Sequence, residues 1–225
     1  MPVVTTNPIS GCPLCAGHDT AAPFARDTTR EYLRCAQCNL VFVPPQFHPA
    51  TDVERQRYDL HQNNPSDPGY RRFLSQLTEP MIARLSAGAK GLDFGCGPTA
   101  ALALLFEETG FKMCRYDPFY QPHQATLKQA YDFVACSEVV EHFFHPTREW
   151  KLLDRLVRTG GLLGIQTGLR EPGTDFLQWW YREDITHVCF YSRLTFEWLA
   201  RSKGLTVEFS GKSVVLLGKP AQLVR

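Results

Sequence analysis

The chain has 225 residues, of which 44% are hydrophobic and 21% are charged, and its formal net charge is +1. This length suits one α/β domain with a small appendage, and the composition excludes a disordered or fibrous protein. The near-neutral charge and the lack of a Lys/Arg-rich run disfavour a broad nucleic-acid-binding surface, although a local basic patch is compatible with a neutral total.

The N-terminus predicts neither export nor membrane insertion. Residues 1–10 read as a loose tail without the basic start and long apolar run of a signal peptide. No apolar stretch approaches the ~20 residues that a membrane-spanning helix needs. We therefore expect a cytoplasmic protein with no membrane partner, whose eight cysteines are reduced thiols or metal ligands rather than disulfides.

Two cysteine pairs stand out in the first part of the chain, among apolar segments that predict short strands. They are Cys12 with Cys15 and Cys35 with Cys38, separated by nineteen residues. This spacing is typical of a zinc site in which two tight turns each present two thiolates. About thirty residues bury little core, so a metal would supply the stability that packing lacks. We predict a zinc ribbon over residues 1–43, structural because four thiolates leave no open position; disulfides or unliganded thiols are the alternatives.

Residues 44–90 are predicted to be a linker followed by helices. The proline-rich stretch Pro44–Pro49 reads as a rigid connector. From Asp52 to Leu85 apolar residues recur at roughly helical spacing, with Asp52 and Asp67 as candidate N-caps.

Residues 91–225 alternate between strand and helix patterns. The predicted strands are 91–94, 111–117, 131–138, 162–167, 205–211 and 213–220, and the predicted helices are 98–110, 146–161 and 192–204. Strands that alternate with helices indicate a mostly parallel sheet covered by helices on both faces. The predicted fold class is therefore α/β, with a small N-terminal zinc ribbon.

The first of these strands runs into a glycine loop, Gly91–Ala100, with the sequence GLDFGCGPTA. Its glycines fit the dinucleotide fingerprint G-x-G-x-x-G/A, and Asp117 lies at the end of the next strand, where an acid would hold ribose hydroxyls. Asp93 distinguishes between the two ligands that this loop could hold, a dinucleotide and a cationic nucleoside. Its carboxylate would repel a pyrophosphate but would attract the sulfonium and ammonium groups of S-adenosylmethionine (SAM).

The stretch Asp93–Gly97 resembles motif I of the class I SAM-dependent methyltransferases, and the resemblance covers most of residues 52–219. YDFVACSEVVEHF is similar to the family's fourth-strand segment, and GGLLGIQT to its next strand. EDITHVCFYSRLTFEWLARSKGL is similar to a D-x-T-H-V-x-F segment of many small members. A zinc-ribbon front also resembles one found on several methyltransferases. The resemblance implies the Rossmann-like sheet of that family.

Two features depart from the family's pattern. Thr99 stands where motif I usually has a third glycine, which leaves Gly95 and Gly97 to approach the ligand. Only fourteen residues separate Asp117 from Asp132, too few for the usual helix, third strand and adenine-contact loop. We therefore expect one compressed connection there, and no adenine-binding acid is assigned.

The resemblance implies a role for each matching residue of the cofactor site. Asp93 and the two glycines should line the methionine end of SAM, and Asp117 should hold the ribose. The expected SAM-binding residues are Tyr58, Asp93, Gly95, Cys96, Gly97, Asp117, Pro118, Ser137, Glu138 and Val139. The alternatives are that Asp93 caps the turn through backbone N–H groups, that Cys96 only packs, and that Tyr58, His61 and Tyr70 only pack their helices.

Methyl transfer is an in-line displacement at the sulfonium carbon, in which the enzyme mainly orients the reactants and excludes water. A hydroxyl or protonated amine as acceptor also needs a base. The candidate catalytic residues are His142 and His187, with Glu141 as a helper, and His145 is a further candidate. For each histidine the alternative is a structural hydrogen bond.

Residues 168–191 are unusually rich in aromatic side chains, namely Phe176, Trp179, Trp180, Tyr181, Phe190 and Tyr191. A segment of this length predicts a lid that closes over the acceptor. The alternative is a flap that packs on the zinc ribbon.

We expect a SAM-dependent methyltransferase with SAM and a structural zinc as cofactors and a small molecule as acceptor, methylated on oxygen or nitrogen. One alternative is an RNA or protein methyltransferase whose ribbon binds the macromolecule, and another is a SAM-binding protein without turnover. The near-neutral charge disfavours RNA, and an aromatic lid favours a small acceptor.

Overall fold

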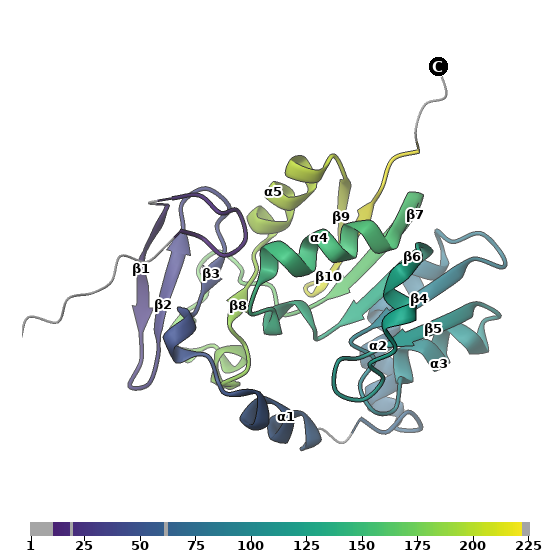
Figure 1. Ribbon diagram of the computed structural model, residues 1–225, viewed down its shortest axis with the longest axis horizontal. Helices are drawn as coiled ribbons and strands as arrows, with labels where there is room; N and C mark the ends of the chain where they lie inside the picture. The colour runs from purple at the N-terminus through teal and green to yellow at the C-terminus, as the bar shows by residue number, and fades with distance from the viewer. Residues whose placement is uncertain (1–10, 19, 61–62, 222–225) are drawn as a thin grey trace, which may run out of the picture.

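The computed structural model describes residues 11–18, 20–60 and 63–221, which form two sheets joined by a shared core (Figure 1). The predicted tail at residues 1–10 and the candidate His61 lie outside the described residues. None of the helices in these described ranges combines the length and the apolarity needed to cross a membrane.

The larger sheet has six strands in the order β5-β4-β6-β7-β10-β9. Its strands are β4 (Lys90–Phe94), β5 (Lys112–Tyr116), β6 (Tyr131–Ser137), β7 (Val157–Gln166), β9 (Thr206–Ser210) and β10 (Val214–Gly218). The first four in spatial order are parallel, and β10 runs antiparallel to both of its neighbours. This mixed, mostly parallel sheet confirms the predicted α/β class.

Helices cover both faces of this sheet. One face carries α2 (Pro68–Ile82) and α3 (Ala101–Glu108), and the other carries α4 (Pro146–Leu156) and α5 (Arg193–Lys203). The Asp67 side chain caps α2 by accepting from the Tyr70 backbone N–H at 2.7 Å, as predicted. The other candidate cap was wrong, because α1 (Thr51–Asp59) begins one residue before Asp52 and has no side-chain cap.

Two predicted helices differ from the structure at their ends. The helix expected from residue 98 begins at Ala101, because the glycine turn continues to Ala100, which has a left-handed φ of 49°. The helix expected to reach Gly161 ends at Leu156, because the next residues pair with the chain after β10: Gly160 N–H donates to Lys219 O at 2.9 Å. Residues 117–130 form a short connection with no strand, so β5 is the sheet edge, which confirms the expected compression.

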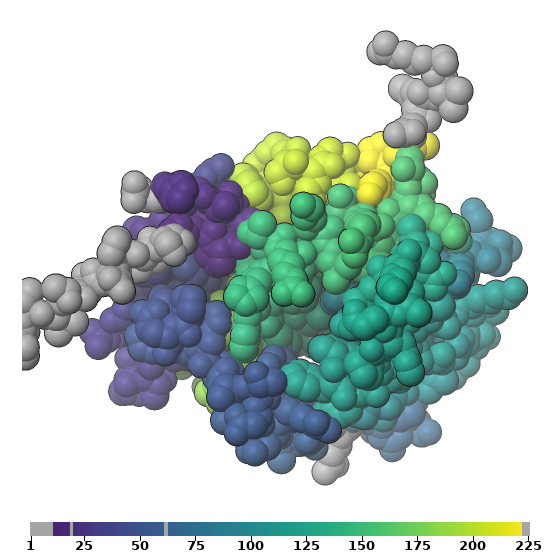
Figure 2. Space-filling model, in the orientation of Figure 1, coloured from purple at the N-terminus to yellow at the C-terminus, as the bar shows by residue number. Residues whose placement is uncertain are grey.

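The smaller sheet joins an early part of the chain to a much later one. It contains β1 (Ala21–Arg26), β2 (Glu31–Cys35), β3 (Val41–Phe42) and β8 (Cys189–Phe190), in that order. The last strand comes from the aromatic segment 168–191 and pairs antiparallel with β3, so the cysteine-bearing hairpin is completed by the C-terminal half. Figure 2 shows the N-terminal part, in purple, packed directly against segments coloured green. Buried side chains of both sheets form one continuous hydrophobic cluster.

Candidate functional site

A cavity of about 1220 Å³ opens at the carboxyl ends of β4, β5 and β6, where ligands of open α/β sheets bind. Its wall includes the glycine loop, the turn after β5, the residues after β6, part of α1 and residues 180–187. Every residue predicted to bind SAM lines it: Tyr58, Asp93, Gly95, Cys96, Gly97, Asp117, Pro118, Ser137, Glu138 and Val139. The cavity also reaches the three candidate histidines, His142, His145 and His187, so cofactor and acceptor regions share one space.

The two glycines of the loop serve different purposes. Gly95 has a φ of 78°, and a Cβ there would lie 2.4 Å from Cγ2 of Val139, so this glycine permits close packing. Gly97 has a φ of 61°, and a Cβ there would meet nothing within 4 Å, so this glycine keeps the cavity open. The N–H groups of Gly95 and Cys96 both donate to Tyr116 O, at 2.8 and 3.1 Å, which holds the loop against the end of β5.

Asp117 ties the glycine loop to the turn after β5. Its Oδ2 accepts from Gly97 N–H at 2.9 Å, and its Oδ1 accepts from the N–H groups of Phe119 and Tyr120 at 2.8 and 3.1 Å. The carboxylate is therefore fixed in place at the cavity wall, buried but reachable from the cavity. A carboxylate with remaining acceptor capacity at this position can take hydroxyl donors from a sugar.

Asp93 is almost completely enclosed, with 1% of its surface exposed. Its Oδ2 accepts from Ala103 N–H of α3 at 3.0 Å. Asp93 therefore does bind a backbone N–H group, but this group belongs to helix α3 and not to the glycine turn. Burial raises the pKa of Asp93 to about 7, although the Ala103 bond and the charge of Arg115 lower it. A buried carboxylate of this kind is stabilised in its charged form by a cation placed in the cavity.

Two glutamates follow β6 within four residues of each other. Glu138 has a left-handed φ of 54°, an unfavourable conformation for a residue with a side chain, and such strain is common at functional sites. Burial and the neighbouring Glu141 raise its pKa well above the usual range. Glu141 is fully buried and accepts hydrogen bonds from the hydroxyls of Thr167, at 3.0 Å, and Tyr181. Both glutamates therefore face the junction between β6 and residues 180–187.

The two histidines lie side by side, with ring centroids 4.7 Å apart. Nδ1 of His142 lies 3.1 Å from Thr186 O, and Nδ1 of His187 lies 2.6 Å from Tyr181 O. Because a carbonyl oxygen only accepts, each Nδ1 carries a proton, and in the neutral ring Nε2 then has the lone pair. Burial lowers the pKa of His142 to about 4, against the raising effect of Glu141, so this ring is neutral near pH 7.

Glu141, His142 and His187 each offer one ligand atom, and these atoms lie within 4.8 Å of one another. The structure thus brings together the three residues predicted to be catalytic. Two imidazoles whose Nδ1–H groups are held by backbone carbonyls, with one carboxylate, can receive a proton or bind a divalent metal. His145 is not part of this group: it is exposed at the N-terminus of α4.

The four cysteines of the ribbon form a second cluster. Sγ of Cys12 lies 3.5 Å from that of Cys38, Sγ of Cys15 lies 3.6 Å from that of Cys35, and all four lie within 4.8 Å of one another. A tetrahedral zinc with bonds of about 2.3 Å requires sulfur–sulfur distances of roughly 3.8 Å, whereas a disulfide requires about 2 Å. The cluster therefore fits one zinc ion and does not fit two disulfides.

Only part of the aromatic segment behaves as the predicted lid. Trp180 and Tyr181 line the cavity, but Trp180 is 71% exposed. Phe176 instead packs edge-on against Phe24 and Tyr32 of the ribbon, with centroids 5.2 and 4.9 Å away. The same segment therefore also packs on the ribbon, as the alternative interpretation expected.

The sequence did not indicate the polar contacts of Thr167 and Tyr181 with Glu141. Tyr181 was noted only as an aromatic residue of the segment, because its partner lies forty residues away in the chain. A usable signal for Thr167 is its position directly after β7, at the sheet edge where functional residues of α/β proteins gather. Tyr58 was expected and packs edge-on against His142, with centroids 5.1 Å apart, so α1 closes over the cavity.

Comparisons with known proteins agree with this geometry. Residues 68–208 match a family described as a methyltransferase domain. The chain is 34% identical over 96 residues to the ubiquinone biosynthesis O-methyltransferase of Sodalis glossinidius, which covers 43% of this chain and 38% of that protein. It is 31% identical over 132 residues to the corresponding protein of Cronobacter sakazakii, covering 52% and 54%. The chain therefore spans about half or less of the length of these relatives.

A solved structure supports the fold. The PH0226 protein from Pyrococcus horikoshii OT3 superposes with a TM-score of 0.52 and 15% identity, over 74% of this chain and 98% of that chain.

Proposed function

Since the chain belongs to the methyltransferase domain family, we propose that it is a SAM-dependent methyltransferase that methylates a hydroxyl group of a small molecule. The observation that carries the proposal is the group of Glu141, His142 and His187, in which two imidazole Nε2 atoms are available next to the cavity that also holds the glycine loop. The O-methyltransferase names of the matched relatives favour oxygen over nitrogen.

SAM is proposed to lie across the carboxyl ends of β4, β5 and β6. Its sulfonium and ammonium groups would lie near Asp93 and Glu138, and its ribose would be held by Asp117. Burial of both acids near the charged ligand supports this arrangement, because a buried carboxylate gains most from a cationic partner. The proposal keeps the predicted division into a ribbon (1–43), a lead-in (44–90) and a methyltransferase domain (91–225), with one structural zinc in the ribbon.

His187 is proposed as the base. The acceptor oxygen attacks the methyl carbon, the bond from that carbon to sulfur breaks to leave S-adenosylhomocysteine, and the acceptor proton moves to Nε2 of His187. We assign the proton to this ring because burial makes His142 a weak base, with a pKa of about 4. A base whose pKa lies far below the working pH is ineffective in general acid–base catalysis.

A divalent metal at the same three side chains is a second way to activate the hydroxyl, because a metal lowers the pKa of a bound hydroxyl without a separate base. The low pKa of His142 favours this alternative, since a ring that resists protonation keeps its lone pair available. The two mechanisms differ in one measurable respect. With zinc in the ribbon and no other metal present, turnover persists under the base mechanism and stops under the metal mechanism.

The experiment is a transfer assay with SAM labelled in its methyl group. Pools of small hydroxylated compounds, RNA and protein serve as separate acceptors, and His187→Ala is compared with His123→Ala, at an exposed histidine, as a control. We expect label in small hydroxylated compounds, and a loss of roughly 10²–10⁴-fold in His187→Ala with SAM affinity nearly intact. Label in RNA or protein alone, or SAM binding without transfer to any acceptor, would contradict the proposal.

A further inference from the structure

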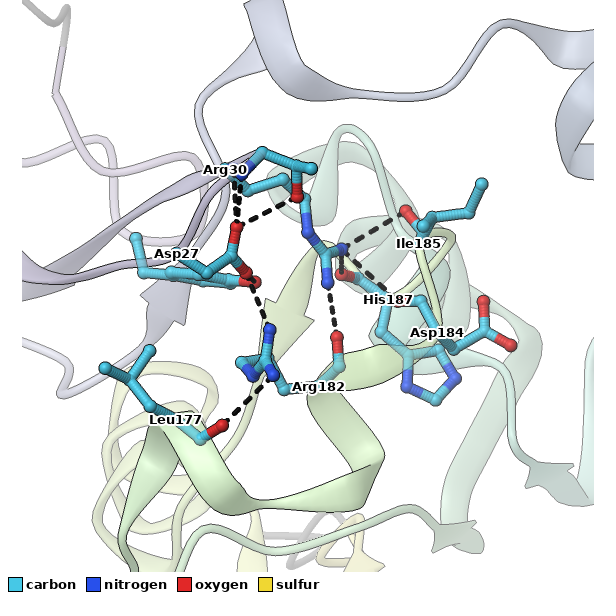
Figure 3. Close-up of polar contacts among 9 residues, drawn as sticks. Asp27, Arg30, Leu177, Arg182, Asp184, Ile185 and His187 are labelled. Carbon is cyan, nitrogen blue, oxygen red and sulfur yellow. Dashed lines mark hydrogen bonds and ion pairs between the residues drawn. The ribbon is translucent and has the colours of Figure 1, made fainter.

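One arginine of the ribbon binds the backbone of the segment that carries the candidate base. Arg30 lies between β1 and β2, is 6% exposed, and points away from its own hairpin (Figure 3). Its Nη1 donates to the carbonyl oxygens of Asp184, Ile185 and His187, at 3.2, 3.3 and 3.3 Å, and its Nη2 donates to Arg182 O. One guanidinium thus gathers four carbonyls from six consecutive residues.

In a second contact the donor is an arginine of the later segment and the acceptor is a carboxylate of the ribbon. Nη1 of Arg182 donates to Oδ2 of Asp27 at 2.6 Å, and the same oxygen accepts from the Tyr32 hydroxyl at 2.7 Å. The other oxygen of Asp27 accepts from the backbone N–H of Arg30 at 2.7 Å. Burial alone would raise the pKa of Asp27, but the hydrogen bonds from Tyr32 and the backbone of Thr29 and Arg30 bring it well below the usual range. Asp27 therefore stays charged and holds both arginines.

The segment held by Arg30, together with Tyr181 directly before it, supplies the carbonyls that hold the two histidines. Thr186 O holds Nδ1 of His142, and Tyr181 O holds Nδ1 of His187. The Tyr181 hydroxyl donates to Glu141. Without Arg30 the buried carbonyl of His187 would lose this donor, whereas Asp184 O would keep its bond from His187 N–H at 3.2 Å. The segment would then lack the cation that holds its carbonyls together, so we expect it to move. Arg30 thus binds carbonyls next to each one that holds a histidine: Arg182 O follows Tyr181, and Ile185 O and His187 O flank Thr186.

From these contacts we propose that Arg30, held by Asp27, is a positioning residue for methyl transfer, through which the ribbon supports residues 182–187 from behind the acceptor cavity. The proposal rests on the proposed function of His187. It explains why the cysteine cluster lies where it does: Cys35 ends β2, so the cluster fixes the far end of the hairpin that carries Arg30. None of the SAM-lining residues of the glycine loop contacts Arg30, so cofactor binding should be separable from positioning.

The test compares Arg30→Met, which keeps most of the volume but removes the donors, with Arg30→Lys. The matched control is Arg26→Met, on the same hairpin, whose side chain is 78% exposed in a surface ion pair with Glu31. Each variant is assayed for zinc content, calorimetric affinity for S-adenosylhomocysteine, kcat, and ¹⁵N NMR shifts of the imidazole nitrogens, which report the tautomer of His187.

We expect Arg30→Met to keep its zinc and its cofactor affinity within about twofold, to lose kcat by about 10- to 100-fold, and to lose the Nδ1–H signature of His187. Arg30→Lys should recover only part of kcat, because an ammonium cannot reach four carbonyls as a planar guanidinium does. Arg26→Met should match the wild type in every measurement.

Two outcomes would overturn the positioning role: an unchanged His187 tautomer in Arg30→Met, or equal losses of cofactor affinity and kcat, which would indicate general destabilisation. The NMR measurement needs no acceptor. If the wild type transferred no methyl group to any compound, the proposed function would fail while the tautomer would still test Arg30.

Discussion

Replacing Asp93 with asparagine is expected to make the protein more stable and its binding of SAM weaker. Burial raises the pKa of Asp93 to about 7, whereas an unfolded aspartate has a pKa of about 3.9. Because the folded pKa is the higher one, the stability linked to this group is fully present below pH 4 and is lost as the pH rises through about 7. Above pH 7 the folded protein therefore contains a buried carboxylate charge that lowers its free energy of unfolding, and a neutral asparagine removes this destabilisation.

The size of the effect follows from the two pKa values. About three units at roughly 1.4 kcal/mol each give an upper limit of about 4 kcal/mol at pH 8, and relaxation of the protein reduces this to roughly 1–3 kcal/mol. For a chain of this length, 1 kcal/mol shifts the melting temperature by about 2–4 °C. Asp93→Asn should thus melt roughly 3–10 °C higher than the wild type at pH 8, higher by about a third of that amount at pH 5, and higher by almost nothing below pH 4.

The effect on ligands should have the opposite sign. If Asp93 faces the sulfonium, the variant loses a charged interaction of about 1.5–3 kcal/mol, which is roughly 10- to 150-fold in affinity for SAM. S-adenosylhomocysteine lacks the sulfonium charge and should be affected less. Calorimetric titration of both ligands, at pH 8, measures the difference directly.

Asp132→Asn is the matched control. This carboxylate lies at the other end of the sheet, where it accepts from Lys90 N–H at 2.8 Å and from Arg158 at 2.7 Å, and the Lys90 bond is the main cause of its lowered pKa. Its replacement should lower stability slightly and leave SAM affinity unchanged. If Asp93→Asn behaves like this control, then Asp93 is a structural cap of α3 through Ala103, and the reasoning about its buried charge is refuted.

Zinc binding, ribose binding and histidine ionisation each give a further expected measurement. Freshly reduced protein should contain about one zinc per chain by elemental analysis, lost in Cys38→Ser, and metal-free protein with ordered disulfides would contradict the ribbon. Asp117→Ala should weaken SAM binding by roughly 1–3 kcal/mol, and NAD should not bind; calorimetry with NAD binding and no SAM binding would reverse the cofactor assignment. The free energy of unfolding should fall by up to about 3 kcal/mol between pH 6.5 and 4, because unfolded His142 takes a proton that the folded ring, with a pKa of about 4, refuses. Denaturation of His142→Asn across that range should show a flatter pH dependence.

The parts of the site that sequence reasoning predicted are those that follow from strand order. Asp93, Asp117 and Glu138 each stand at the carboxyl end of a strand, and parallel strands bring those ends to one edge. Their hydrogen-bond partners were not predictable, because a cavity-lining acid such as Asp93 can accept a hydrogen bond from the backbone of a helix ten residues away.

The joining of the two sheets was not predicted for a different reason. Strands β3 and β8 have two residues each, so neither carries the alternation from which strands are recognised. The role of Arg30 was equally hidden, since its acceptors are backbone carbonyls more than 150 residues away and carbonyls have no sequence signature.

The pairing of β3 with β8 also sets an order of events during synthesis. The paired residues are about 150 positions apart, and translation at 5–20 residues per second separates their emergence from the ribosome by roughly 7–30 s. Throughout that interval the hairpin has an open apolar edge at Val41–Phe42, and Arg30 lacks its acceptors. Unpaired strand edges recruit other chains, so this edge of a newly made chain is open to aggregation until Cys189 and Phe190 have been synthesised.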